Sequence, residues 1–320
     1  MGDIQDETCA FERSQFDNPT YRLVMSTMYS TVALVTTVLN SLILFSIWKT
    51  PSLHKPSYIL IGSLALSDLL FGAVGEPLMV IYNIVALRGS SINISCLLLK
   101  CATCVLIAFS VISLVTLTVI VLDRLLAVKL RNRYQSVVTQ KRVLYILLTL
   151  WIISCVSLAA VFGKASWNDE TSLALILFCG VGMLVLVSTI TVCYSMAFYS
   201  LRKITSSLVS PSVQNAEAGA RPSCNIDVAK YRKSLTTMFV VFIFTILFYA
   251  PFICTLIAFS VTADQQLSSL VYLEIRYVSV SVVEFIALLN SAMNPLLYLW
   301  RIRVIREAVK TSIKTAFKIF

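Results

Sequence analysis

The chain has 320 residues, of which 58% are hydrophobic and only 13% are charged. This composition and a mean hydropathy of +0.85 exclude an ordinary soluble domain and indicate an integral membrane protein. The net charge of +10 requires no nucleic-acid partner, because basic residues kept on the cytoplasmic side, where they attract anionic membrane lipids, account for it.

Seven apolar stretches follow a polar N-terminal tail, residues 1–23, and each is long enough to cross about 30 Å of hydrocarbon as a helix. They lie near residues 24–48, 57–82, 97–122, 143–163, 171–199, 234–260 and 272–299. Continuous runs of this kind favour helices over the short alternating strands of a membrane barrel. We therefore predict an all-α bundle of seven transmembrane helices over residues 24–299.

The connecting segments predict the orientation of the bundle. If the N-terminus is extracellular, 20 of the 26 basic residues lie in cytoplasmic segments. The longest connection, at about 200–233, contains Ser, Pro, Gly and Ala over residues 206–223 and is typical of a mobile cytoplasmic loop. Residues 300–320 alternate basic and apolar positions at helical spacing, which predicts an amphipathic helix on the membrane surface. Asn93 begins a glycosylation sequon, expected on a short extracellular loop.

Polar residues inside the apolar stretches are the first candidates for function. Asp68 lies in the middle of the second stretch, where a charge is costly unless it is paired, hydrated or ion-bound. Asn40, Ser113, Asn290 and Asn294 lie at compatible depths in other stretches. Together they predict an oxygen-rich cavity suited to a small hard cation such as sodium.

Other features have simple structural explanations when each is taken alone. Asp123 and Arg124 read as an ion pair at the end of the third helix, and Pro251 predicts a bend in the sixth. Their order along the chain, one feature per apolar stretch, resembles the rhodopsin-like (class A) family of G-protein-coupled receptors. The residues that carry the resemblance are Asn40, Leu64 to Asp68, Asp123, Arg124, Trp151, Tyr194, Pro251 and Asn294 to Tyr298.

The resemblance implies a plasma-membrane receptor whose extracellular ligand opens the cytoplasmic face for a heterotrimeric G protein, with arrestin as a further partner. It implies activation roles for Asp123, Arg124, Tyr194, Tyr249, Pro251, Asn294, Pro295 and Tyr298. In the family, the arginine matching Arg124 is held by the acid beside it and reaches toward two tyrosines on activation. Asp68, Ser113, Asn290 and Asn294 match the family's allosteric sodium pocket, and no other cofactor is expected.

Departures from the family pattern narrow the resemblance. Leu125 replaces the usual tyrosine after Arg124, and the loop between the fourth and fifth stretches, 163–171, has no cysteine for the common disulfide. These features look like the cluster of melanocortin, lysophospholipid, cannabinoid and adenosine receptors, and melanocortin receptors are nearest in these features. A bridge from Cys9 to Cys96 or Cys101 is a hypothesis that the residues leave open.

The ligand is predicted from two acids in the outer half of the bundle, Glu76 and Glu284. They favour a cationic ligand such as a basic peptide or an amine, while internal pairing or protonation of the glutamates is the alternative. Leu106 occupies the position at which receptors for amines carry an aspartate, which weighs against an ordinary monoamine.

Three other functions remain as alternatives. An atypical receptor with high basal activity would explain Leu125, Tyr249 and the absence of an acid near Tyr231. A transporter or channel would use Asp68 for conduction, although the sequence shows no internal repeat. An enzyme is not expected, since the single histidine, His54, lies in a loop and no nucleophile and base are paired in a recognisable motif.

Overall fold

The structure, a computed structural model, describes residues 18–89, 91–130, 133–163, 169–209, 236, 239–240, 242–251, 253–255 and 270–317. Every regular element in these ranges is helical. The elements are α2 (Pro19–Lys49), η1 (Pro51–Leu53), α3 (Pro56–Leu70), the π-helical turn η2 (Phe71–Gly75), α4 (Glu76–Leu87), α5 (Ile92–Leu130), α6 (Tyr134–Val137), α7 (Gln140–Gly163), α8 (Asp169–Val209), the helix Phe242–Thr255, α10 (Leu270–Arg301) and α11 (Arg303–Phe317).

Four helices in the described part are long and apolar enough to cross a membrane. They are Pro19–Lys49, Pro56–Leu87, Asn93–Leu130 and Val181–Ser200. The helices α7, α10 and Phe242–Thr255 cover residues of the other three predicted stretches. The predominantly helical fold is therefore confirmed, and its helices coincide with the apolar runs of the sequence.

Two helices extend past the predicted apolar stretches, and one residue expected on a loop lies in a helix. The third helix does not end near residue 122 but continues to Leu130, and α8 continues to Val209, so the loop expected at 200–233 begins as helix. Asn93 was expected on a loop, but it lies in the first turn of α5 with an exposed side chain. The length of an apolar run indicates which residues lie in the hydrocarbon core of the membrane. A helix can continue beyond that core into the polar headgroup region and the solvent.

Helix starts follow from local capping chemistry. The side chain of Asn18 accepts hydrogen bonds from the backbone N–H groups of Thr20, at 3.0 Å, and Tyr21, at 3.3 Å, and Pro19 occupies the first turn of α2. Pro56 likewise occupies the first turn of α3. Proline suits this position because its missing N–H would have no partner within the helix.

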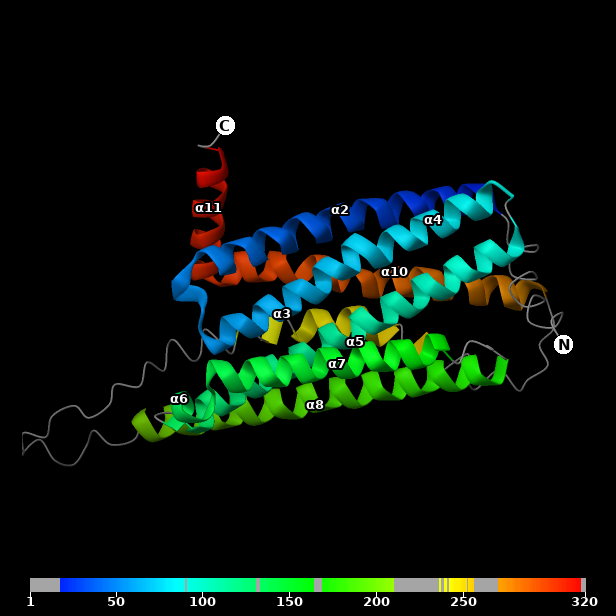
Figure 1. Cartoon of the computed structure of the whole chain (residues 1–320). Coiled ribbons are helices and arrows are strands. Elements are labelled where there is room, and N and C mark those ends of the chain that lie inside the picture. Colours follow the sequence, from blue (N-terminus) through cyan, green and yellow to red (C-terminus); the bar gives the residue numbers. More distant parts are fainter. Residues whose placement is uncertain are drawn as a thin grey trace, which may run out of the picture.

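The long helices run side by side, and α5 is central, since it contacts α3, α4, α7 and α8 (Figure 1). After α10 the chain turns sharply into α11, whose axis runs across the direction of the long helices (Figure 1). The Ser46 hydroxyl of α2 lies 3.2 Å from the Ser312 hydroxyl of α11 and ties the two helices together. We call this end of the bundle the α11 end, and the opposite end, where α2 begins, the Asn18 end.

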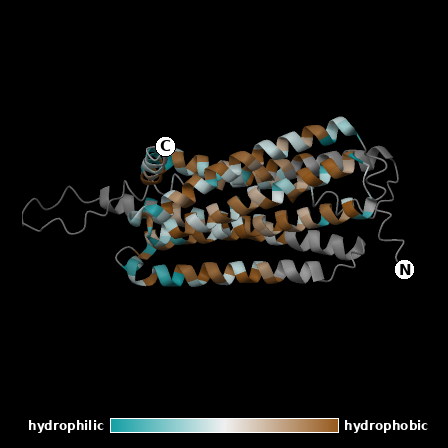
Figure 2. Cartoon of the chain, turned by 45° about the horizontal axis from the view of Figure 1, so that its top comes forward, coloured by the Kyte–Doolittle hydropathy of each residue, from teal (hydrophilic) through white to brown (hydrophobic). Residues whose placement is uncertain are grey.

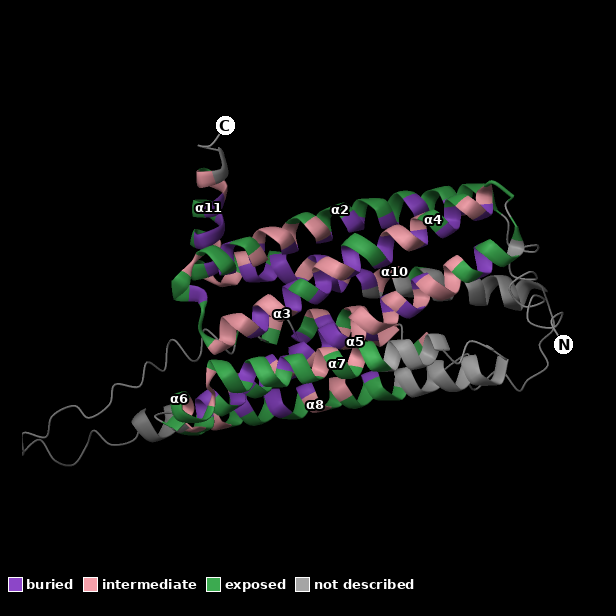
Figure 3. Ribbon diagram, in the orientation of Figure 1, coloured by how far each residue is buried: buried purple, intermediate pink, exposed green. Residues whose placement is uncertain are grey.

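Hydrophobic side chains cover much of the outer surface as well as the interior. Figure 2 shows hydrophobic residues along most of each long helix, and Figure 3 shows exposed residues on the outward faces of α2, α7 and α8. Leu34 is 67% exposed, and Ile152 and Val181 are each 62% exposed. Apolar surface of this extent is unusual on a soluble monomer and is expected where helices face lipid.

The turn η2 brings the second predicted span close to its neighbours through two glycines. A Cβ atom at Gly72 would lie 2.9 Å from Cβ of Thr36 in α2, and one at Gly75 would lie 2.7 Å from Cδ2 of Leu106 in α5. Small residues at such contacts let helix backbones approach in the absence of a hydrophobic driving force between them.

We expect Gly72→Ala to lower the unfolding temperature of the purified protein, because the contacting Thr36 Cβ is attached to the backbone and overpacking costs about 1–3 kcal/mol. Gly182→Ala is the matched control. A Cβ atom at Gly182 would meet nothing within 4 Å, so helix propensity alone should stabilise α8 by about 0.5–1 kcal/mol. Equal effects of the two substitutions on the unfolding temperature would contradict the close packing at Gly72.

Candidate functional site

Asp68 lies at the centre of a buried polar cluster that joins three helices. Its side chain is 0% exposed, and Oδ1 accepts a hydrogen bond from the Ser113 hydroxyl of α5 at 3.1 Å. Oδ2 accepts a hydrogen bond from Nδ2 of Asn294 in α10 at 2.9 Å. The Ser291 side chain, one turn from Asn294, is a further hydrogen-bond partner. The sequence had singled out Ser113 and Asn294 but missed Ser291.

Asn40 and Asn290 are the other predicted members of this cluster. Their hydrogen bonds in the described structure go to groups other than the Asp68 carboxyl group. Nδ2 of Asn40 donates to the backbone oxygen of Ser291 at 3.3 Å and so links α2 to α10. The side chain of Asn290 bonds to the hydroxyl of Tyr249, which also bonds to the side chain of Ser110. The cluster therefore extends to the helix Phe242–Thr255 through Tyr249.

The residues around Asp68 suit a small hard cation. The carboxylate oxygens and the hydroxyl oxygens of Ser113 and Ser291 are the ligand types that such ions prefer. Burial keeps water from the Asp68 carboxylate, so its charge must be compensated by an ion or by the few polar side chains around it. Asp68, Ser113, Ser291 and Asn294 are thus the side chains that would hold the ion.

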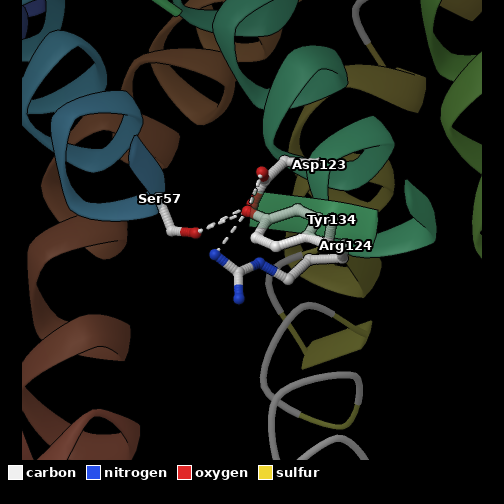
Figure 4. A network of polar contacts seen from close by, with 4 residues as sticks. All are labelled: Ser57, Asp123, Arg124 and Tyr134. Carbon is white, nitrogen blue, oxygen red and sulfur yellow. Dashed lines mark hydrogen bonds and ion pairs between the residues drawn. The ribbon is translucent and has the colours of Figure 1, made fainter. Parts of the chain in front are cut away.

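A second cluster lies at the α11 end around Asp123 (Figure 4). Oδ2 of Asp123 is 2.9 Å from Nη2 of Arg124 and accepts a hydrogen bond from the Ser57 hydroxyl of α3 at 3.0 Å. Oδ1 accepts a hydrogen bond from the Tyr134 hydroxyl of α6 at 2.5 Å. The predicted pair of Asp123 and Arg124 is therefore present, and two residues from other elements complete it.

Burial differs sharply within this pair. The side chain of Asp123 is 3% exposed, whereas that of Arg124 is 20% exposed. Because the carboxylate is almost fully withdrawn from solvent, its three partners each compensate part of its desolvation. Arg124 is thus held on one side by the acid and remains accessible on the other.

Tyr134 is buried beside the Asp123 carboxylate, and both conditions oppose ionisation of its phenol. Burial, with the hydrogen bond to Asp123 as the next cause, raises the pKa of Tyr134 to about 12. The phenol therefore stays protonated and keeps donating its hydrogen bond throughout the physiological pH range.

The two tyrosines expected to receive Arg124 on activation are both buried. Tyr194 of α8 stacks on Phe239 and Phe242, with ring centroids 5.0 Å and 5.8 Å away. Tyr298 of α10 is 1% exposed, and its hydroxyl has no hydrogen-bond partner in the described part of the chain. A buried hydroxyl without a partner gains free energy from any rearrangement that supplies one.

The two prolines of the predicted activation set also lie in helices. Pro295 is inside α10, where it removes one backbone hydrogen bond of the helix. Pro251 lies in the helix Phe242–Thr255, next but one to Tyr249. Both therefore stand beside polar side chains of the Asp68 cluster.

Toward the Asn18 end, Glu76 begins α4 directly after the π-helical turn η2. Its side chain is 0% exposed, and neither carboxyl oxygen has a hydrogen-bond partner among the described residues. Leu106 is 3% exposed and packs in the same region. Glu284 lies in α10, but its side chain is outside the described part. A feature that the sequence analysis missed is Arg22, which is 1% exposed with its guanidinium 5.6 Å from the centre of the Tyr82 ring.

One cysteine at the start of α5 forms a disulfide. Cys96 is disulfide-bonded, whereas Cys101 is free, so a bridge from the N-terminal tail to Cys101 is excluded. Cys155, Cys193 and Cys254 are also free. The partner of Cys96 belongs to the side chains outside the described part, and its assignment to Cys9 stays a prediction.

The chain is similar to known membrane receptors. A family model described as "7 transmembrane receptor (rhodopsin family)" matches residues 39–298. The chain is 28% identical to adenosine receptor A3 of Ovis aries over 86% of its length and 85% of that receptor. It is 28% identical to sphingosine 1-phosphate receptor 1 of Danio rerio over 81% of its length and 69% of that receptor. A 36% identical match to adenosine receptor A3 of Bos taurus covers 45% of the chain and 43% of that receptor.

The buried environment of Tyr134 predicts that its phenol ionises at a higher pH than a free tyrosine does. The tyrosinate absorbance that Tyr134→Phe removes should have its midpoint near pH 12, against about 10 for a free tyrosine. Because folding raises this pKa, its contribution to stability is complete below about pH 10 and is lost as the pH rises to about 12. Ultraviolet difference titration of the two proteins measures the midpoint. A midpoint near 10 would contradict the buried hydrogen bond to Asp123.

Proposed function

Because the chain belongs to the rhodopsin family of seven-transmembrane receptors, we propose that it transmits the binding of an extracellular ligand to a heterotrimeric G protein. The chain is a multi-pass membrane protein, and its similar proteins are receptors for signalling molecules. The finer parts of the proposal are a seven-span bundle in the plasma membrane, the G protein as the partner of the α11 end, and arrestin as a competing partner there.

The arrangement around Arg124 is the observation that carries the proposal. Its ion pair with Asp123 lies at one end of the bundle and is held from two other elements by Ser57 and Tyr134. Such a set is a two-state device, since release of Arg124 from Asp123 frees a cation at the end of α5. Tyr298, whose buried hydroxyl has no partner in the described part of the chain, is a suitable acceptor in the second state.

The charge distribution supports a cytoplasmic location for the α11 end. Basic residues lie in the segments that meet at that end, at the end of α2, the start of α3, the last turns of α5, α8 and α10, and in α11: Lys49, Lys55, Arg124, Lys129, Arg202, Arg301 and Lys310. Cytoplasmic segments of membrane proteins retain Lys and Arg. The Asn18 end is then extracellular and is where the ligand enters.

Arg124→Ala tests the coupling directly. We expect it to abolish changes in cyclic AMP and calcium, both without ligand and with any activating ligand, in cells with verified surface expression. Arg202→Ala, an exposed arginine at the same end, is the control and should retain signalling. Full signalling by Arg124→Ala would refute its role as the switch, and a strong signal without ligand that Arg124→Ala abolishes would identify a receptor with high basal activity.

We further propose that sodium occupies the Asp68 cluster and stabilises the inactive receptor. The ion would bind Asp68 with Ser113, Ser291 and Asn294, which are the buried oxygen-bearing side chains bonded to its carboxyl group in the described structure. A ligand that binds only the folded inactive state raises its stability in proportion to the logarithm of ligand concentration.

Sodium chloride should raise the unfolding temperature of the purified receptor, whereas the same concentration of N-methylglucamine chloride should not. At a sodium concentration ten times the dissociation constant, the gain is about 1.4 kcal/mol. Asp68→Asn should remove the difference between the salts, and Asp123→Asn, a matched change at the α11 end, should keep it. Equal responses to the two salts in the unmodified protein would sink the sodium proposal.

For the ligand we propose a cation bound by Glu76 and Glu284. The observation in favour is the complete burial of the Glu76 carboxyl group without a hydrogen-bond partner in the described structure. An ionised carboxylate in that state is strongly unfavourable, and an ammonium or guanidinium group would compensate it. The names of the similar receptors add two probes, adenosine, which is uncharged, and sphingosine 1-phosphate, which carries an ammonium group.

Signalling should be measured with basic peptides, amines, adenosine and sphingosine 1-phosphate on Glu284→Gln and Glu76→Gln receptors. For a cationic ligand, each neutralisation should weaken potency about tenfold or more, since a hydrogen bond to a charged group contributes about 1.5–3 kcal/mol. Glu307→Gln, on the exposed face of α11, is the control. Unchanged potency of every activating cation would exclude the anionic site, and activation by adenosine alone would replace it with an uncharged ligand.

A further inference from the structure

An apolar groove lies on the outer surface between α8 and the helix Phe242–Thr255. Its volume is about 170 Å³, and its walls are formed by Leu184, Val187 and Ser188 on one side and by Ile246, Ala250 and Cys254 on the other. The groove is separate from the Asp68 cluster and from the network around Arg124, and none of the activation or ligand residues lines it.

The surroundings of the groove face the hydrocarbon. Leu184 is 43% exposed, and Val185 and Leu247 beside it are 57% and 59% exposed. Leu184 and Val185 belong to Val181–Ser200, one of the four candidate spans. Side chains this apolar and this exposed on a membrane-spanning helix contact acyl chains, so the mouth of the groove opens into lipid.

Water is a poor occupant of this space. A buried water molecule needs two to four polar partners, and Ser188 is the sole polar side chain in the walls. The Ser188 hydroxyl already donates to the backbone oxygen of Leu184 at 2.8 Å. An empty groove is unfavourable as well, because its lining atoms lose their dispersion contacts.

We propose that the groove binds the acyl chain of a membrane phospholipid. A cavity of about 150 Å³ holds a molecule the size of benzene, so this groove holds a short segment of a flexible chain and not the fused rings of a sterol. The charged lipid headgroup gains no ionic contact with the groove walls, because no charged residue lines them. Affinity comes from packing alone, since lipid and protein are equally apolar here.

Photo-crosslinking tests the proposal on the full chain in bilayer nanodiscs. The probe is phosphatidylcholine with a diazirine in the middle of one acyl chain, and adducts are mapped by mass spectrometry after irradiation. We expect adducts concentrated on residues 184–188 and 246–254 relative to Ile152 and Val156, which are equally lipid-exposed on α7. Uniform labelling of all exposed apolar residues would overturn the proposal.

Substitutions that fill the groove with a larger side chain can be compared with a similar substitution outside it. Ala250→Phe should reduce the groove adducts about fivefold, equivalent to ~1 kcal/mol. Ser188→Leu fills the groove from the opposite wall and decides the matter if Ala250→Phe does not fold. Val192→Phe, on a 57% exposed position of α8 outside the groove, should leave the adducts unchanged. Adducts that persist in the filled variants, or stronger labelling by a diazirine sterol than by the phospholipid, would refute an acyl-chain site.

Discussion

The buried carboxyl group of Asp68 determines how three helices of the bundle meet. Withdrawing an ionised carboxylate from water is costly unless polar partners compensate it, and the chain supplies partners for Asp68 from α5 through Ser113 and from α10 through Asn294 and Ser291. The same cluster reaches α2 through Asn40. The interior is therefore fixed by hydrogen bonds where the apolar side chains alone would leave the helices free to slide in lipid.

The same constraint underlies the switch that we propose. Asp123 has three partners and is stable as it stands, whereas Tyr298 is buried without a hydrogen-bond partner in the described residues. Glu76 is buried in the same way, and neither of its carboxyl oxygens has a hydrogen-bond partner among the described residues. Satisfied groups hold one conformation, and unsatisfied groups favour a change that supplies a cation or a donor. In the proposed function, the unsatisfied groups at the two ends of the bundle serve different partners.

The sequence predicted the helices well, because long apolar runs have few alternative explanations. It could not assign Ser291 over Asn290, since adjacent helical residues point about 100° apart and Pro295 and the π-helical turn η2 alter that phase locally. Ser57 and Tyr134 were missed because their contacts with Asp123 span 66 and 11 positions and depend on how the elements pack.

The measurement that tests this account most directly is a double-mutant exchange of Asp68 and Asn294. Asp68→Asn and Asn294→Asp should each lower the unfolding temperature of the purified protein, because each leaves its buried partner without a matched hydrogen bond. The reciprocal double variant restores one carboxylate and one amide in contact, so we expect it to recover much of the loss, with a coupling free energy above about 1 kcal/mol. Additive losses in the double variant would show that the two side chains do not act as a pair and would contradict the account.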